Sequence, residues 1–156
     1  MTSVRTAVFP DDHATVSALV GAYLRRTEAE KAERGLVAEG APLAERYARE
    51  IADPATAFAG RRVLLAEVGS IAAGIVVVAA SRTGTEISRL WTARSVRGRG
   101  VGRALVDAAL EHAPRPVRLS VWRWREPAIA LYRRCGFHVA PSWDDRPDLL
   151  CLELSA

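Results

Sequence analysis

The sequence has few of the features that stabilise secreted proteins or anchor membrane proteins. Only two cysteines occur in 156 residues, so we expect no disulfide framework and a reducing compartment. The longest apolar run, residues 71–80, is far shorter than the ~20 residues that a membrane helix needs. Asp11 and Asp12 follow the N-terminus closely, with no apolar segment of signal-peptide length before them. These absences predict a cytoplasmic protein with no membrane partner.

Several catalytic and metal-binding patterns are also missing. The three histidines and two cysteines show no metal-ligand spacing, so no metal is predicted. There is no G-x-S-x-G motif and no recognisable Cys–His pair, which argues against a covalent nucleophile. Nothing in the composition indicates disorder, since 49% of the residues are hydrophobic and 26% are charged.

Lysine is scarce, and the basic residues are unevenly distributed. Of 22 basic residues only Lys31 is a lysine, and 18 acidic residues leave a net charge of +4. Residues 82–103 contain six arginines and one acid, Glu86, and residues 115–134 again contain six arginines and one acid. Such a basic second half indicates an anionic ligand, with nucleic acid or a plain solvated arginine surface as alternatives.

The hydrophobic pattern predicts a single domain over residues 1–156. Alternating or continuous apolar segments predict strands at residues 4–8, 62–68, 71–80, 85–93, 117–122, 137–143 and 149–154. Helical spacing predicts helices after the Asp11–Asp12 cap, from Pro42 to Ile51, over 101–112 and from Pro127 to Cys135, and residues 27–40 read as a helix end plus loop. The expected fold is an α/β (α+β) sandwich with a mixed, mostly antiparallel central sheet of six to seven strands flanked by helices.

The most informative segment is the glycine-rich turn at residues 97–103. It follows a predicted strand and opens a predicted helix, whose first N–H groups have no partner within the helix. Glycines allow an anion to approach this backbone, so the segment predicts an anion site. The spacing matches neither a Walker loop nor a dinucleotide fingerprint, and a tight turn that happens to be basic is the structural alternative.

Two motifs in this half of the chain resemble those of the GNAT (Gcn5-related N-acetyltransferase) superfamily. Arg97-x-x-Gly100-x-Gly102 is similar to its pyrophosphate-binding signature, and Ala128-x-x-Leu131-Tyr132-x-x-x-Gly136-Phe137 is similar to its second conserved helix. The resemblance covers roughly residues 71–137. It implies a GNAT-like fold, acetyl-CoA as co-substrate, an amine acceptor, and a homodimer by analogy with relatives.

The resemblance also implies which residues form the site. The strands before the two motifs would splay apart, so that the backbone of Leu90, Trp91 and Thr92 binds the acetyl carbonyl and pantetheine. The pyrophosphate would bind the turn, namely Arg97, Gly98, Arg99, Gly100, Val101, Gly102 and Arg103. Tyr132 matches the Tyr whose hydroxyl lies near the thioester sulfur and would act as the acid, although a packing role is the alternative.

Glu86 is the candidate base or proton relay. It is the sole acid of residues 82–103, and some GNAT members carry a base Glu eleven residues before the first motif. Without a bulge, it would share a strand face with Ser88, Leu90 and Thr92. An ion pair with Arg82 or Arg89 is the alternative.

The sequence departs from the GNAT pattern at two positions. Arg125 stands where many members have Asn, and it could bind a CoA phosphate instead. Ser120 stands where acetyltransferases of the ribosomal-protein type carry Glu, which weakens that substrate assignment. Trp91, Trp122 and Trp124 could wall an apolar or aromatic acceptor pocket, or simply pack.

The predicted function is transfer of acetyl from acetyl-CoA to a primary amine, on a small molecule, by direct attack in a ternary complex. The first 55 residues would select the acceptor, and the acidic segment 28–50 favours a cationic amine. Two alternatives stay open: a protein or peptide N-acetyltransferase, and a non-catalytic module that binds acyl-CoA or nucleic acid.

Overall fold

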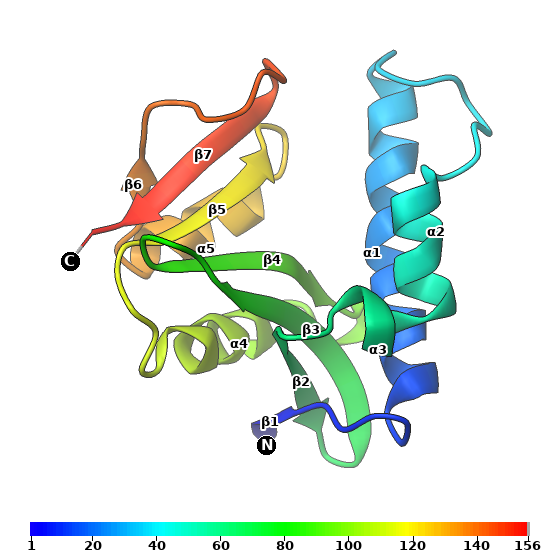
Figure 1. The fold of residues 1–156 in the computed structure, drawn as a ribbon, viewed down its shortest axis with the longest axis vertical. Coiled ribbons are helices and arrows are strands. Elements are labelled where there is room, and N and C mark those ends of the chain that lie inside the picture. Colours follow the sequence, from blue (N-terminus) through cyan, green and yellow to red (C-terminus); the bar gives the residue numbers. More distant parts are fainter. Residues whose placement is uncertain (156) are drawn as a thin grey trace.

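A computed structural model describes residues 1–155, which form one seven-stranded sheet with helices on both faces (Figure 1). The strand order is β1-β2-β3-β4-β5-β7-β6, and among residues 1–155 only β4 and β5 pair in parallel. The strands are β1 (Thr2–Thr6), β2 (Arg62–Val68), β3 (Ile71–Ala80), β4 (Thr85–Thr92), β5 (Val117–Trp122), β6 (His138–Val139) and β7 (Leu149–Leu154). The helices are α1 (His13–Glu33), α2 (Glu45–Ala52), α3 (Pro54–Ala57), α4 (Val101–Leu110) and α5 (Glu126–Arg134), with a 3₁₀ turn η1 (Arg94–Val96). The predicted mixed, mostly antiparallel sheet is confirmed.

Each face of the sheet has its own hydrophobic core. On one face α1 packs on β2 and β3 through a cluster that includes Val16, Val20, Leu65 and Ile75. On the other face a second cluster, which includes Leu105 of α4, packs under α4 and α5. Because β3 lies between the two cores, its central residues are buried on both sides, as its continuous apolar sequence requires.

The parallel pair β4–β5 is held together only at its beginning. Thr85 pairs with Val117 and Glu86 with Arg118, and beyond these positions the strands diverge (Figure 1). Thr85 anchors the junction by donating from its backbone N to Pro116 O (3.0 Å) and from Oγ1 to Pro114 O (2.7 Å). From residue 87 to residue 92, the β4 edge that faces β5 therefore has no strand partner.

A β-bulge interrupts β4 just beyond this junction. The β3–β4 register jumps from Val77↔Ser88 to Ile75↔Trp91, and Arg89 takes a left-handed conformation with φ 59°. Trp91 consequently joins the core under α1, whereas Leu90 joins the core under α4. The extra residue reverses the alternation of side chains along the strand.

The predicted common face of Glu86, Ser88, Leu90 and Thr92 is therefore wrong. Ser88 pairs with Val77 of the α1-side core, which places Glu86 and Ser88 on that side of the sheet. Leu90 and Thr92 lie on the opposite side, next to α4. No residue type in the sequence marks the bulge.

Several predicted element boundaries shift. Helix α1 continues to Glu33, so residues 27–40 are a helix end followed by a loop as predicted, but the second helix begins at Glu45 rather than at Pro42. Strand β1 occupies residues 2–6 instead of 4–8, and the strand predicted over 137–143 shortens to two residues. The helix predicted over 101–112 ends at Leu110.

Asp12 precedes α1 as predicted, but its side chain does not cap the helix. Its carboxylate accepts bonds from Arg5 Nη1 (2.7 Å), Arg5 Nη2 (2.8 Å) and Val8 N (2.7 Å). The Arg5 bonds, followed by the Val8 N–H, lower the pKa of Asp12 to about 2. The acid thus fastens β1 to the start of α1.

Within residues 1–155, no helix combines the length and the apolar character needed to span a bilayer.

Candidate functional site

Two pockets meet where β4 and β5 diverge. The first, here called the turn pocket, has a volume of about 650 Å³ and is lined by the glycine-rich turn together with residues of β4, α1 and α5. The second, the sheet pocket, has a volume of about 970 Å³ and lies among β4, β5, α1, α2 and the segment before β7. Both are lined by Leu90, Arg125 and Ala128, so the gap between the strands joins them.

The turn pocket is built around two glycines with left-handed backbone. Gly98 has φ 81° and Gly100, the residue that precedes α4, has φ 80°. A Cβ placed on either glycine would meet no heavy atom within 4 Å, so this backbone borders open space. The first N–H groups of α4 point out of the helix end without intrahelical partners. Such an end fits the oxygens of a phosphate or diphosphate.

Positive charge surrounds this turn. Arg97 donates from Nε to Thr92 O (3.2 Å), and its guanidinium lies 4.7 Å from the centre of the Trp91 ring. Burial, followed by repulsion from Arg94, Arg125 and Arg26, lowers the pKa of Arg97. Together with Arg97, these three arginines create a positive electrostatic potential that favours binding of an anion.

Tyr132 lies on α5 and lines the sheet pocket. The residue is only 6% exposed, and its ring makes an edge contact with Phe137 at 5.7 Å between centroids. Burial raises the pKa of the Tyr132 hydroxyl above its ordinary value, so the group stays protonated at neutral pH. A protonated hydroxyl beside the gap between the strands can donate to a leaving group.

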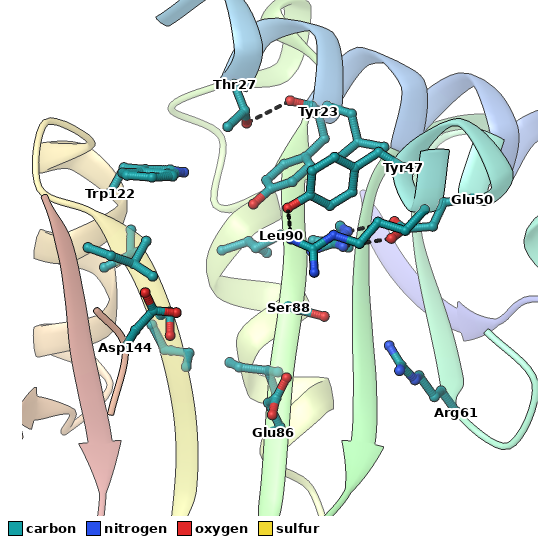
Figure 2. A pocket seen from close by; sticks show the side chains of 18 of the residues that line it. Tyr23, Thr27, Tyr47, Glu50, Arg61, Glu86, Ser88, Leu90, Trp122 and Asp144 are labelled. Atoms are coloured by element: carbon teal, nitrogen blue, oxygen red, sulfur yellow. Dashed lines mark hydrogen bonds and ion pairs between the residues drawn. The ribbon is translucent and has the colours of Figure 1, made fainter. Parts of the chain in front are cut away.

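Glu86 and Ser88 line the sheet pocket from β4 (Figure 2). The predicted alternative, an ion pair from Glu86 to Arg82 or Arg89, is absent from the described residues. Arg89 instead binds buried Glu50 of α2 in a fork, with Nε to Oε1 and Nη2 to Oε2 both at 2.7 Å. Burial acts to lower the pKa of Arg89, but the bonds and charge of Glu50 outweigh burial and raise it. The carboxylate of Glu86 is thus left to interact with whatever enters the pocket.

A polar network joins α1 to the loop before α5. Glu30 accepts from Trp124 Nε1 (3.0 Å) and Arg125 Nε (2.9 Å), and Arg125 Nη2 donates to Thr27 Oγ1 (2.7 Å). Burial acts to raise the pKa of Glu30, but the Trp124 bond and the Arg125 charge outweigh it and lower the pKa. We call these four residues the α1 bridge; it spans the open side of the diverging strands, between the two pockets.

The α1 bridge engages Arg125 in bonds that the sequence did not predict. Its side chain is only 14% exposed, so binding a CoA phosphate would require these bonds to break. The partners lie more than 90 residues apart in the chain, and no local pattern signals the contact.

The three tryptophans do not form one wall. Trp122 lines the sheet pocket, whereas Trp91 and Trp124 line the turn pocket. Trp122 and Trp124 stack at 4.8 Å with an interplanar angle of 13°, and the Arg34 guanidinium lies 4.2 Å from the Trp124 ring centre. Tyr23 and Tyr47 also line the sheet pocket (Figure 2), as do Tyr132 and Trp143. No motif in the sequence marks Tyr23 or Tyr47 as a pocket residue.

No cluster of three or more His, Cys, Asp or Glu side chains in the described part of the chain could hold a metal ion.

Comparison with known proteins gives one family and many similar folds. The acetyltransferase (GNAT) family matches residues 23–137. No curated protein sequence matches the chain significantly. The Salmonella typhimurium protein yncA, solved with its cofactor acetyl-CoA, has a TM-score of 0.70 at 17% identity, covering 99% of this chain and 93% of its own. A ribosomal-protein-alanine N-acetyltransferase from Brucella melitensis has a TM-score of 0.66 at 20% identity, covering 99% of both chains. An acetyltransferase of the GNAT family from Streptococcus pneumoniae has a TM-score of 0.63 at 20% identity, covering 100% of both.

The α1 bridge predicts a measurable coupling between Glu30 and Arg125. In a double-mutant cycle with Glu30→Gln and Arg125→Met, we expect a coupling free energy of about 1–2 kcal/mol, because both side chains are largely buried and charged. Urea denaturation measures it. The exposed pair Arg103–Asp107 (3.0 Å) is the matched control, and its coupling should stay below about 0.5 kcal/mol. Equal coupling at both sites would contradict a structural role for the bridge.

Proposed function

The chain belongs to the GNAT family of acetyltransferases, and we propose that it transfers the acetyl group of acetyl-CoA to a primary amine on a small molecule. The observation that carries the proposal is the meeting of the two pockets at Leu90 and Ala128. One pocket offers free helix N–H groups to an anion, and the other offers a protonated tyrosine and an unpaired carboxylate. A thioester that passes between β4 and β5 would meet both sets of groups.

The turn pocket fits the diphosphate of acetyl-CoA. The backbone at Gly98 and Gly100 borders open space, and Arg97 and Arg103 of the same turn line the pocket with positive charge. The unpartnered edge of β4 offers the backbone of Leu90, Trp91 and Thr92 to the pantetheine amides. The yncA structure with acetyl-CoA supports this assignment through the shared fold.

Acetyl transfer requires a neutral amine and a protonated leaving group. The amine nitrogen attacks the thioester carbon, the C–S bond breaks, and the thiolate takes a proton. We assign that proton to the Tyr132 hydroxyl, which is protonated at neutral pH and lines the pocket beside the gap between the strands. The proton lost by the amine goes to Glu86, directly or through water, because this carboxylate has no cation partner among the described residues.

The acceptor pocket favours a small molecule over a ribosomal protein. Ser120 lines the sheet pocket at the position where acetyltransferases of the ribosomal-protein type carry Glu. Trp122 and the tyrosines provide apolar walls, and Glu50–Arg89 closes the pocket from the side of α2. The fold shared with the Brucella enzyme carries no information on the acceptor.

Replacing Gly100 tests where the coenzyme binds. Gly100→Ala should raise the Kd of CoA, measured by calorimetry, by about tenfold or more, because a side chain enters the anion site. Gly40→Ala is the matched control: Gly40 also has a positive φ (74°) and open surroundings but lines neither pocket. Both variants carry the same backbone strain, so an equal loss of affinity would contradict the assignment.

Removing one hydroxyl tests the acid. Tyr132→Phe should lower kcat by about 10²-fold, while the Kd of CoA changes little, because the hydroxyl acts only as the thiolate leaves. Thiol release from acetyl-CoA with an amine panel measures kcat, and calorimetry measures binding. An unchanged rate would rule out Tyr132 as the proton donor.

A further inference from the structure

Most charged side chains that line the sheet pocket have an oppositely charged partner, and a few do not. The lining carries eight Arg or Lys side chains against five Asp or Glu. Three of the acids are neutralised by Glu28–Lys31 (2.8 Å), Glu50–Arg89 (2.7 Å) and Asp144–Arg146 (2.7 Å). Asp53 accepts the N–H of Thr56 (3.3 Å) at the start of α3. Within the described residues, Glu86 is the lining acid left without such a partner.

Most of the remaining cations that line the pocket also have partners. Arg49, Arg118 and Arg125 bind Glu45, Glu153 and Glu30, respectively. Arg46 stacks on Tyr47 (4.6 Å) and donates to its hydroxyl (2.7 Å). Arg61, in the segment before β2, has no carboxylate partner in the described part of the chain, and it lines the same pocket as Glu86 and Ser88 (Figure 2).

The acidic segment 28–50 does not supply free negative charge. Of its six acids only Glu39 lacks an ion pair among residues 1–155; the pairs are Glu28–Lys31, Glu30–Arg125, Glu33–Arg34, Glu45–Arg49 and Glu50–Arg89. The predicted preference for a cationic acceptor therefore loses its basis. A polycation would instead meet an excess of arginine.

The sheet register brings Glu86 and Arg61 into one row. Glu86 pairs with Ala79 of β3, and Arg62, the first residue of β2, pairs with the preceding Val78, so Arg61 comes just before β2 near the level of Ala79. Glu86 and Ala79 face the α1-side core, because Val77 and its β4 partner Ser88 lie on that side, and Arg61 lines the pocket on the same side. Two strand spacings separate Glu86 from Arg61 by about 10 Å of main chain. Ala79, whose side chain is a single methyl group, lies on the strand between them.

We propose, on the premise of the proposed function, that the acceptor is a primary amine that also carries an anionic group, as in a free amino acid. The ammonium or amine binds toward Glu86, and the carboxylate or phosphate pairs with the guanidinium of Arg61 across Ala79. Both side chains are long enough to reach over Ala79, so the distance between their charged groups can match the length of a small zwitterion. Glu86 and Arg61 then each gain an oppositely charged partner from the acceptor.

Matched acceptors test this proposal. Thiol release from acetyl-CoA is measured with L-phenylalanine against phenethylamine, with O-phosphoethanolamine against ethanolamine, and with spermidine. We expect kcat/KM to be about tenfold or more higher for the anionic member of at least one pair. The carboxylate and phosphate pairs identify which anionic group the enzyme recognises. Spermidine should have a low kcat/KM. Equal kcat/KM within both pairs, or a higher kcat/KM for the members without the anionic group or for spermidine, overturns the proposal.

Matched variants locate the anion site. Arg61→Gln should bring the ratio of kcat/KM within the preferred pair close to one. Arg62→Gln, one residue along on the opposite face and outside both pockets, should leave that ratio unchanged. An Arg61→Gln variant that slows both members equally overturns the assignment.

Failure of the proposed function is separable from failure of this inference. If no amine releases thiol, acetyl transfer itself is refuted. The same acceptor pairs are then compared by saturation-transfer NMR on the wild type and on Arg61→Gln. If the wild type binds the anionic member preferentially and Arg61→Gln loses this preference, Arg61 still binds the anionic group of the acceptor. Equal binding of both members to the wild type overturns the inference.

Discussion

The whole arrangement depends on the short pairing of β4 with β5. Two residue pairs join the strands, and Thr85 fixes the junction through bonds to Pro114 and Pro116. Gly84 is required there because a Cβ would overlap the carbonyl oxygen of Pro116. Past this point the sheet opens, which exposes backbone donors and acceptors that a continuous sheet would consume. The two pockets meet only because of this opening.

Two further contacts shape the opening. The bulge at Arg89 turns Leu90 toward α4 and Trp91 toward α1, and the Arg89–Glu50 fork ties the bulge to α2. At the wider end, the α1 bridge connects Glu30 to the loop before α5. A β4 edge that is free but held in place is a preorganised partner for an extended ligand, since little ordering entropy is left to lose on binding.

Local sequence predicted most elements because their signals are local. The apolar run of β3, the glycines of the turn and Pro127 at the start of α5 each specify structure within a few residues. The bulge was missed because it arises from the register between β3 and β4. The role of Arg125 was missed because Glu30 and Thr27 reach it from a distant helix. Segment 28–50 looked free and negative because the sequence does not show which charges pair. Glu28, Glu33 and Glu45 pair with neighbours in the chain, and Glu30 and Glu50 pair with the distant Arg125 and Arg89.

A crystal structure with CoA bound tests the central claim most directly. The account predicts the diphosphate against the amides of residues 98–103 and the pantetheine arm along the free edge of β4. The thiol should then lie between β4 and β5, within reach of the Tyr132 hydroxyl. A coenzyme that binds outside the turn pocket, or an arm that does not enter between the strands, would contradict it.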